Sequence, residues 1–598
     1  MLVCKWTEEC IQIKFEYDKE LVNRVRQIQG RRWNPDNKIW TIPHSSYEQL
    51  KRDFAKSEIA WEVPPPDQRA GNEFDYSSIP IDESLYDMFN EDYKPYDYQV
   101  IGASFLVWRK CAMIADEMGL GKTLIALLAL MKARKEGKVN KGIVICPASL
   151  KRQWAKEVEK FTDINAIVID GDQDTRMELW RELWKNPDLE LAIVNYELLL
   201  RDDFTAIKEL VKEDLVQVLI LDEAQYIKNY NTKTSKAIMT IRNKVDYKWC
   251  MTGTPMENKP EEIFNIFKFM DQSILGGNPF RFRNRYNVYG RFNNVIGHRR
   301  LPELHSRLAP YMLRRRREEV DLELPDTIEK DVTLPMTNLQ KRLHEKIVED
   351  LKAEIDNEGD EEVYFDGDGD VFITEEDEIG TVMGKFALLM GVADSPELMS
   401  MTSSHYGRRL LKKMGIDPDG RAIKKSPKLD YTVDTLKEIL ENNSEDKTII
   451  FTRSEKMQML IAERLGEENI SYTILNGTMN STQRDDAVEE FVNGSASVFI
   501  STDAGATGLN LQVARTLINF DLPWNPAVLN QRMGRNNRVG SEHDTIMYIN
   551  LLSEDSIDER IRNILYTKQN IFDMVVEKTE GEAESIRLTG NKMKKLLQ

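Results

Sequence analysis

Short apolar runs that alternate with helical patterns constrain the fold of this chain more than any other feature of its sequence. They occur twice, over residues 93–270 and over residues 428–570, with VQVLILDE an example in the first stretch and KTIIFT in the second. Strands that are apolar on both faces are typical of parallel sheets that helices cover on both sides. We therefore expect an α/β protein built on two parallel-sheet lobes with helical insertions.

The remaining residues divide into four parts. Residues 1–62 combine strand-like alternation, as in CIQIKFEY, with helical spacing, as in DKELVNRVRQI, which predicts a small N-terminal α+β domain. Residues 63–92 begin with a run of prolines and continue with polar and acidic residues, so we expect a linker. Residues 271–427 are predicted to be a helical and acidic insertion region between the lobes, and residues 571–598 a charged helical tail.

The composition restricts the class of protein. The 598 residues include 41% hydrophobic and 30% charged side chains, which is ordinary for a globular protein. No apolar run approaches the roughly 18 residues that a membrane helix needs, so we expect no membrane partner. The five cysteines form no CxxC pair and the six histidines are scattered, which favours a reducing compartment and argues against a zinc site.

The net charge of −18, taken as a whole, argues against binding to nucleic acid. Phosphate binding needs only a local basic groove, however, and much of the acid is concentrated between Asp350 and Glu378. We therefore expect a basic cleft on an acidic body. The acidic stretch contains DGDGD, but a calcium loop that starts at Asp366 would have Val371 and Asp377 where glycine and glutamate are required, so we expect a solvated surface insertion.

The segment DEMGLGKT at residues 116–123 lies between a strand-like run and a helical run, which is the setting of a phosphate-binding loop. Lys122 would reach the β- and γ-phosphates of ATP, and the hydroxyl group of Thr123 would hold Mg²⁺. Asp116 stands where the full pattern has glycine, and the alternative is a chance glycine-rich turn. The residues expected to hold the nucleotide, by backbone N–H groups or by side chains, are Met118, Gly119, Leu120, Gly121, Lys122 and Thr123.

The segment VLILDEAQ at residues 218–225 is an apolar strand that ends in two acids. Asp222 would hold Mg²⁺ in its outer shell, and Glu223 would polarise the attacking water and take its proton. Acids end many strands by chance, but an acidic strand end that comes after a phosphate-binding loop, with sheet-like sequence between them, predicts a site for ATP hydrolysis.

A third segment, QRMGRNNRVG at residues 531–540, belongs to the second lobe. Arg535 and Arg538 are three residues apart, so a helix would place both on one face. Guanidinium groups stabilise the charge that develops on a γ-phosphate, and we expect these two arginines to act in catalysis from across a cleft. ATP binding would then close the cleft and hydrolysis would reopen it. The alternative is a solvated basic helix face.

These segments together resemble the Swi/Snf-type ATPases of helicase superfamily 2, over roughly residues 93–570. The resemblance implies that the two lobes are RecA-like and that Gln99 reads the adenine base. Gln225 departs from the family pattern, which usually has histidine there. Further segments that resemble family motifs are CPASLKRQW (Ia), VNYELL (Ib), DEAQYIKN (II), TGTPMEN (III), YMLRRRREEVDLELP, IIFTRSEKM (IV), STDAGATGLNLQVARTLINFDLPWNP (V) and QRMGRNNRVG (VI).

The resemblance also implies ATP and Mg²⁺ as cofactors and translocation on double-stranded DNA without full strand separation. Contacts to the DNA backbone suit a motor, because it must ignore base sequence as it moves. The alternative for each expected contact is an ordinary surface residue. The residues that the resemblance assigns to these contacts are Ser149, Lys151, Asn195, Tyr196, Thr502 and Asn525.

Near the N-terminus, GRRWNPDNKIWTIP combines arginines with tryptophans. Arg31 and Arg32 can hold phosphate while Trp33 and Trp40 stack on unpaired bases. The segment resembles the small domain of HepA-related annealing helicases, in which the two tryptophans would frame a hairpin. The alternative is that both tryptophans belong to the core of a small unit, where large aromatic side chains contribute most to stability.

We therefore expect a DNA-dependent ATPase that translocates on duplex, forked or branched DNA and anneals strands or remodels forks. One alternative is an ATPase that displaces or remodels protein–DNA complexes, with a protein partner docked on the acidic insertion at residues 353–378. Others are a strand-separating DNA or RNA helicase and a catalytically silent scaffold. The expected location is the cytoplasm, at a bacterial nucleoid or in a phage-infected cell, or the nucleus of a eukaryotic cell.

Overall fold

The structure is a computed structural model, and contacts divide the chain into two compact units: Met1–Tyr76 with Pro302–Pro310, and Ser77–Leu301 with Tyr311–Gln598. The residues that the structure describes are 2–6, 10–15, 18–28, 30–35, 39–43, 46–54, 59–63, 74–90, 93–201, 203–256, 259–289, 295–320, 325–358, 382–401, 405–417, 420, 423–503, 509–537, 541 and 543–576.

The N-terminal unit is built on a five-stranded sheet with the order β3-β4-β2-β1-β5. Its neighbouring strands are antiparallel except for β1 and β5, which are parallel. Alternate apolar residues, such as Ile11 and Ile13, enter the core because successive side chains of a strand point to opposite faces. The elements are β1 (Leu2–Trp6), β2 (Ile11–Lys14), α1 (Lys19–Val25), β3 (Arg32–Asn34), β4 (Ile39–Ile42), α2 (Tyr47–Asp53) and β5 (Ile59–Val63).

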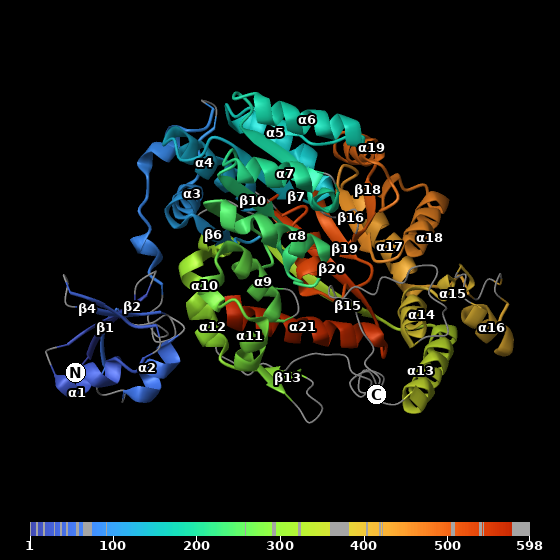
Figure 1. Ribbon diagram of the computed structural model, residues 1–598. Helices are drawn as coiled ribbons and strands as arrows, with labels where there is room; N and C mark the ends of the chain where they lie inside the picture. Colours follow the sequence, from blue (N-terminus) through green and yellow to red (C-terminus); the bar gives the residue numbers. More distant parts are fainter. Residues whose placement is uncertain are drawn as a thin grey trace. The chain divides into compact units, whose positions relative to one another are not determined.

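The first lobe of the larger unit is built on a seven-stranded parallel sheet with the order β14-β6-β11-β10-β7-β9-β8. Its strands β6, β7 and β10 are labelled in Figure 1. Its inner strands are buried along their whole length, as their continuous apolar sequence predicts. The strands are β6 (Cys111–Ile114), β7 (Gly142–Cys146), β8 (Ala166–Val168), β9 (Leu191–Asn195), β10 (Val218–Asp222), β11 (Tyr247–Met251) and β14 (Met312–Leu313). The helices are α3 (Asp97–Arg109), α4 (Lys122–Lys135), α5 (Lys151–Phe161), α6 (Gln173–Lys185), α7 (Asp203–Lys212), α8 (Lys233–Ile241) and α9 (Glu261–Met270).

The second lobe is built on a six-stranded parallel sheet with the order β15-β20-β19-β16-β18-β17. The prediction of two parallel-sheet lobes is therefore confirmed. The strands are β15 (Asp326–Leu334), β16 (Lys447–Thr452), β17 (Tyr472–Leu475), β18 (Val498–Thr502), β19 (Ala514–Asn519) and β20 (Thr545–Ser553). The helices are α17 (Pro427–Asn442), α18 (Glu455–Glu467), α19 (Ser481–Val492), α20 (Pro526–Met533) and α21 (Ile557–Val576).

The predicted insertion region contributes an edge strand to each sheet. β14 pairs with β6 in the first lobe and β15 pairs with β20 in the second, so the sheets extend past the boundaries expected at residues 270 and 428. β14 has only two residues and β15 is largely exposed, so neither produces the continuous apolar signal of an inner strand. The segment that connects these two strands also connects the two lobes.

The rest of the region between the lobes is mostly helical, and α13 lies beside α14 (Figure 1). Of the predicted acidic insertion, residues 353–358 end α13, and residues 359–378 lie outside the described residues. No helix in the described part of the chain is both long enough and apolar enough to cross a bilayer. The elements are α10 (Gln272–Leu275), α11 (Pro279–Tyr286), β12 (Asn287–Tyr289), β13 (Val295–His298), α12 (Leu301–Leu308), α13 (Asn338–Glu358), α14 (Val382–Asp394), α15 (Leu398–Met401) and α16 (His405–Lys413).

Candidate active site

The glycine-rich loop joins the end of β6 to the start of α4. Gly119 and Gly121 have φ angles of 90° and 66°, which side-chain-bearing residues rarely adopt. A Cβ atom on Gly121 would also lie 2.8 Å from Nε2 of Gln99, so the loop and the buried Gln99 are in close contact. The predicted adenine-reading residue therefore lies against the predicted phosphate loop.

Lys122 is the first residue of α4 and its ammonium group is turned back into the loop. Its Nζ donates hydrogen bonds to the main-chain oxygens of Asp116, at 2.9 Å, and Glu117, at 3.2 Å. Burial lowers the pKa of Lys122 to about 8, although the nearby carboxylates of Glu223, Asp116 and Asp222 favour the charged form. The predicted phosphate-binding lysine therefore lies where the predicted Mg²⁺-binding and proton-accepting carboxylates meet.

Asp222 ends β10, as the sequence predicts, and both of its carboxylate oxygens accept hydrogen bonds. Nε1 of Trp154 donates to Oδ2 at 2.8 Å, and the backbone N–H of Glu223 donates to Oδ1 at 2.9 Å. Burial, together with the charge of Glu223, raises the pKa of Asp222 to about 7. Trp154 lies in the segment that resembles motif Ia, and its role in orienting Asp222 is not evident from the sequence.

Gln225, the departure from the family pattern, bridges two motifs. Its Nε2 donates to Oε2 of Glu223 at 2.9 Å, and its Oε1 accepts a hydrogen bond from the hydroxyl group of Thr252 at 2.6 Å. Thr252 in turn accepts from the backbone N–H of Thr254 at 2.9 Å. The side chain expected to activate water is thus tied to the TGTP segment by a buried amide.

The basic run at residues 314–317, which we call the arginine strap, holds the glycine-rich loop in place by hydrogen bonds. Arg314 donates to the main-chain oxygens of Ala115, at 2.7 Å, and Gly253, at 3.3 Å. Arg317 donates from Nε to the main-chain oxygen of Met118 at 2.8 Å. The backbone continues the pairing of β14, because the N–H of Ala115 donates to the oxygen of Leu313 at 2.7 Å. These side chains fix the loop from the segment that connects the lobes.

Arg315 is the ion-pair partner of Asp116, the acid that stands in place of the first glycine of the loop pattern. Nε of Arg315 lies 3.0 Å from Oδ1 of Asp116, and Nη2 pairs with Oδ2. Asp116 is fully buried, so its charge requires this partner. Arg315 also donates to the main-chain oxygen of Tyr98, next to Gln99. The interpretation of DEMGLGKT as a chance turn has no support in this arrangement.

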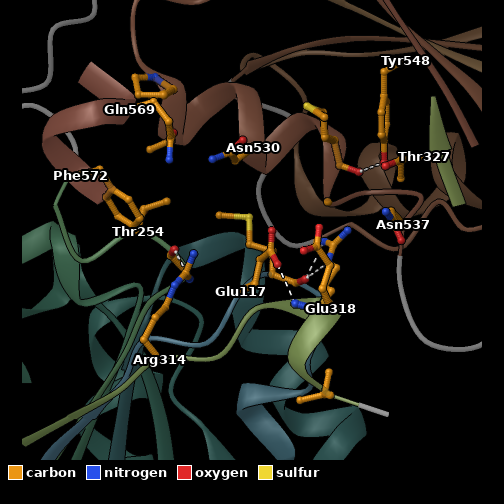
Figure 2. A pocket seen from close by; sticks show the side chains of 18 of the residues that line it. Glu117, Thr254, Arg314, Glu318, Thr327, Asn530, Asn537, Tyr548, Gln569 and Phe572 are labelled. Atoms are coloured by element: carbon orange, nitrogen blue, oxygen red, sulfur yellow. Dashed lines mark hydrogen bonds between the residues drawn. The ribbon is translucent and has the colours of Figure 1, made fainter. Parts of the chain in front are cut away.

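A cavity of about 530 Å³ lies between the loop and the second lobe. In Figure 2, Glu117 and Arg314 come from the first lobe, while Asn530 and Phe572 come from helices of the second. At its wall a Cβ atom on Gly534 would lie 3.1 Å from Cβ of Met118, so the glycine-rich loop contacts the start of the GRNNR segment directly. The two lobes therefore meet at the residues predicted for nucleotide binding and catalysis.

Arg535 is buried in the second lobe. Its Nε donates to the main-chain oxygen of Gln531 at 2.9 Å and its Nη1 to that of Leu509 at 3.3 Å. These contacts are within its own lobe, so its role at the γ-phosphate stays a prediction that requires a change of side-chain conformation. Arg538 lies outside the described residues. Arg532, which the sequence did not single out, is fully buried and pairs with Asp503 at 2.6 Å.

Three of the residues expected to contact DNA are buried in the first lobe. Nζ of Lys151 donates to the main-chain oxygen of Ile169 at 3.2 Å. The hydroxyl group of Tyr196 donates to the main-chain oxygen of Asp222 at 2.9 Å, which braces the end of β10. Asn195 donates to the carboxylate of Glu197 at 2.5 Å, whereas Ser149 is exposed.

The two residues of the second lobe that are expected to contact DNA are also buried, so their contacts to DNA stay a prediction. Asn525 is buried and caps α20 by accepting from the N–H of Ala527 at 2.9 Å. Thr502 is buried, and its hydroxyl group has no hydrogen-bond partner among the described residues. Of the six residues, only Ser149 is placed on the surface in this structure. The other five are buried, and all of them except Thr502 use their side chains in hydrogen bonds inside the protein.

In the N-terminal unit the two tryptophans differ in exposure. Trp33 lies on the edge strand β3 and is 47% exposed, beside the exposed Arg31 and Arg32. Trp40 is buried in the core, and the two ring centroids are 5.1 Å apart. Trp33 is therefore exposed enough to stack on a base. Trp40 is a core residue, which is the alternative that the sequence left open.

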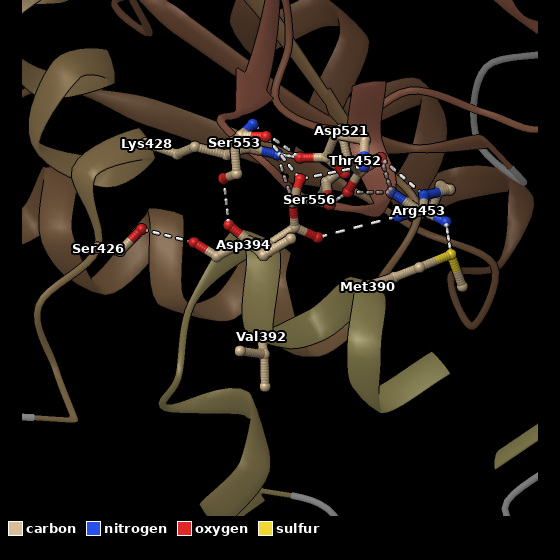
Figure 3. Close-up of polar contacts among 12 residues, drawn as sticks. Met390, Val392, Asp394, Ser426, Lys428, Thr452, Arg453, Asp521, Ser553 and Ser556 are labelled. Carbon is tan, nitrogen blue, oxygen red and sulfur yellow. Dashed lines mark hydrogen bonds and ion pairs between the residues drawn. The ribbon is translucent and has the colours of Figure 1, made fainter. Parts of the chain in front are cut away.

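A buried network of charges anchors α14 to the second lobe (Figure 3). Lys428 lies 2.8 Å from Asp394 and 2.7 Å from Asp558, and these carboxylates raise its pKa although burial opposes the charged form. Arg453 pairs with Asp521 at 3.2 Å. Arg453 lies in the segment that resembles motif IV, and its guanidinium group pairs with a carboxylate inside the protein.

Two family models match this chain. The SNF2-related domain matches residues 98–372, and the helicase conserved C-terminal domain matches residues 431–540. Together the two matches cover more than half of the 598 residues. The first match includes the glycine-rich loop, the acidic strand end and the arginine strap, and the second includes the whole GRNNR segment.

Curated relatives match about four fifths of this chain. A putative ATP-dependent helicase/translocase, YwqA, of Bacillus subtilis is 27% identical over 80% of this chain and 48% of its own length. An uncharacterized ATP-dependent helicase, YqhH, of the same species is 28% identical over 79% of this chain and 77% of its own length. The ISWI chromatin-remodeling complex ATPase ISW2 of Saccharomyces cerevisiae is 27% identical over 81% of this chain and 41% of its own length. The chain thus spans less than half the length of two of these three relatives.

Among solved structures, the SWI2/SNF2 ATPase core of Sulfolobus solfataricus in complex with double-stranded DNA is 27% identical in sequence to this chain. The alignment covers 82% of this chain and 95% of that structure, with a TM-score of 0.37.

Proposed function

The chain belongs to the SNF2 family of helicase-related ATPases, and on that premise we propose that it is an ATP-driven motor that translocates along double-stranded or branched DNA. One observation carries the proposal: the glycine-rich loop of the first lobe and the GRNNR segment of the second meet at Met118 and Gly534 beside a cavity. A nucleotide bound at such a junction changes the preferred separation of the lobes, and a motor uses that change as its stroke.

The residues of the loop fit ATP and Mg²⁺ by their chemistry. The hydroxyl group of Thr123 and the carboxylate of Asp222 are oxygen donors, and Mg²⁺ takes few protein ligands because water and phosphate complete its shell. When bound, ATP supplies the transferred phosphoryl group and Mg²⁺ neutralises its charge. Lys122 binds the phosphates, and Gln225 orients Glu223 to accept the proton of the attacking water.

Arg535 and Arg538 complete this proposed chemistry from the second lobe. They would stabilise the charge that develops on the γ-phosphate once the lobes close. Arg535 must exchange its hydrogen bonds to Gln531 and Leu509 for the phosphate. Hydrolysis therefore depends on lobe closure, which is how a motor couples chemistry to movement.

We further propose that the N-terminal unit directs the motor to forks, where it anneals strands. Trp33 is half exposed at a sheet edge beside Arg31 and Arg32, and an exposed aromatic ring beside guanidinium groups stacks on unpaired bases while the charges hold phosphate. Forks present unpaired bases next to duplex. The motor lobes would then translocate on the duplex arm.

The similarity to the yeast ISW2 ATPase favours a second candidate function, the displacement of proteins bound to DNA. The same motor serves both functions, because translocation along duplex DNA drives either re-pairing or displacement. The two candidates differ in the outcome of translocation, which is a re-formed duplex in one case and a released protein in the other.

Rates of ATP hydrolysis test the proposal directly. We would compare no nucleic acid, single-stranded DNA, duplex DNA, forked DNA and RNA at one salt concentration, since phosphate binding is strongly salt-dependent. We expect stimulation by duplex DNA and greater stimulation by the fork. Stimulation by single strands or RNA alone would favour a strand-separating helicase. Duplex stimulation without a fork preference, together with ATP-dependent release of a protein roadblock but no annealing, would favour the second candidate.

A further inference from the structure

One segment of this acidic chain contains no acid at all. Residues 272–302 include six arginines and no aspartate, glutamate or lysine, whereas the whole chain has a net charge of −18. The segment forms α10, α11, the hairpin of β12 and β13 and the start of α12. Five of the six arginines lie among the described residues, in α11 and between β13 and α12, and Arg291 lies outside them.

Helix α11 carries arginines on both flanks of its buried side. Its apolar side is fixed by Phe282 and Tyr286, whose rings lie 4.7 Å apart, and Phe282 also packs 4.9 Å from Phe264. Residues offset from that pair by one or two positions face away from the core. Phe280 is accordingly 66% exposed, and Arg281 is exposed beside it.

Arg283 extends the surface to the loop that comes after the acidic strand end. Its Nη2 donates to the hydroxyl group of Tyr230 at 2.5 Å, and its guanidinium carbon lies 5.5 Å from the centre of the same ring. Tyr230 is itself 40% exposed. A phenol carries no full charge, so the contact positions the guanidinium group, and within the described part of the chain Arg283 forms no ion pair.

Both ends of α11 are held in place. Asn278 caps its N-terminus by accepting from the N–H of Phe280 at 2.9 Å. At the other end Arg299 donates to the main-chain oxygen of Asn284 at 2.7 Å, and Arg300 comes next on the exposed side. The arginines are therefore displayed on a rigid support, which lowers the cost of ordering them when a partner binds.

We propose that this surface, made of Tyr230, Phe280, Arg281, Arg283, Arg299 and Arg300, binds the phosphate backbone of duplex DNA. The proposal rests on the proposed function and adds a DNA-binding surface to it. Guanidinium groups match phosphate by paired hydrogen bonds, and the interleaved rings of Phe280 and Tyr230 supply apolar contact to the sugars. Tyr230, one member of this surface, lies seven residues after Glu223, the acid expected to activate water.

The test compares two double variants of the full chain that change charge equally. One is Arg281→Glu with Arg283→Glu. The matched control is Arg181→Glu with Lys185→Glu, which reverses two exposed charges on α6 of the same lobe. Binding of a fluorescent duplex is measured from low to moderate salt, and hydrolysis is measured with and without duplex.

We expect the α11 variant to bind duplex roughly tenfold more weakly or worse, and its salt dependence to lose about one unit of slope for each phosphate contact removed. Its hydrolysis without DNA should equal that of the wild type, and more duplex should be needed for half-maximal stimulation. Equal effects of the two double variants on affinity and salt slope would overturn the proposal.

Failure of this inference is distinct from failure of the proposed function. A wild-type protein that duplex DNA does not stimulate contradicts the proposed function itself. A stimulated wild type with an α11 variant that behaves like the control contradicts only the DNA surface. Arg281→Glu alone provides a second variant, because its side chain is exposed and its loss leaves the Arg283–Tyr230 contact intact.

Discussion

Asp116 and Arg315 form an ion pair beneath the glycine-rich loop, with Nε of Arg315 3.0 Å from Oδ1 of Asp116. The two residues are 199 positions apart in the sequence, and the main-chain oxygen of Arg315 also accepts the N–H of Glu117 at 3.0 Å. The segment that holds the loop then enters the second sheet as β15. One segment therefore both connects the two lobes and supports the proposed nucleotide site.

The ion pair should behave as a unit in stability measurements. Asp116→Ala leaves Arg315 without its carboxylate, and Arg315→Met leaves a fully buried carboxylate unpaired, so each should lower the free energy of unfolding by about 3 kcal/mol. The double variant should lose much less than the sum. Urea unfolding of the four proteins measures the coupling, and additive losses would show that the pair contributes nothing as a pair.

Gln225 should couple the catalytic acid to the TGTP segment. Gln225→Leu removes the hydrogen bond to Glu223 and the one from Thr252, so kcat with DNA should fall about tenfold or more while the affinity for ATP changes little. Thr252→Val should lower kcat in the same direction. Because both changes break one bridge, the double variant should be no slower than Gln225→Leu, whereas multiplied effects would indicate independent roles.

His344 should make the protein less stable in acid. The side chain is buried, burial lowers its pKa from 6.5 to about 4, and Nε2 has no hydrogen-bond partner in the described part of the chain. Between these pH values the unfolded chain binds the proton and the folded chain does not, so stability falls as pH drops from 6.5 towards 4. The loss is about 3 kcal/mol at 1.36 kcal/mol per pKa unit.

Chemical denaturation at several pH values tests this assignment. His344→Leu should remove most of that part of the pH dependence, because the buried group no longer titrates. His543→Gln, which changes a half-buried histidine just before β20 whose ring contacts the main-chain oxygen of Val513, is the matched control and should keep the wild-type slope. A wild-type slope in His344→Leu would contradict the prediction.

Trp33 should supply the preference for forks. Stacking of one base on an aromatic ring contributes about 1–3 kcal/mol, so Trp33→Ala should weaken fork binding roughly tenfold and reduce fork-stimulated hydrolysis to the level seen with duplex. Trp184→Ala removes a tryptophan of similar exposure, 41% against 47%, from α6 and should leave the preference unchanged. An unchanged preference in Trp33→Ala would remove the basis for assigning forks to the N-terminal unit.

The sequence predicts the parts of this protein that local pattern determines. Continuous apolar runs predict the inner strands, and the order of glycines, Lys122, Thr123 and the acids after β10 predicts the nucleotide site. Long-range pairing is not encoded in any such pattern. Neither the strap of Arg314, Arg315 and Arg317 nor the hydrogen bond from Trp154 to Asp222 has a local signal, since the partners come from distant segments.

The surroundings of the residues expected to contact DNA also have no local signal in the sequence. Asparagine is mostly exposed in proteins and tyrosine is intermediate, so Asn525 and Tyr196 in DNA-binding motifs suggest positions at the surface. In this fold Tyr196 donates to the backbone at the end of β10 and Asn525 caps α20, and both are buried. Burial depends on the tertiary partner, which the motif does not specify.

The central claim is that ATP hydrolysis between the two lobes moves the protein along duplex DNA. The most direct measurement is the displacement of a triplex-forming oligonucleotide from a duplex, because a protein that tracks along the duplex removes the third strand without separating the other two. We predict displacement that requires ATP hydrolysis by the wild type, and none by Glu223→Gln, which should still bind ATP. DNA-stimulated hydrolysis without displacement, or equal displacement by Glu223→Gln, would contradict the claim.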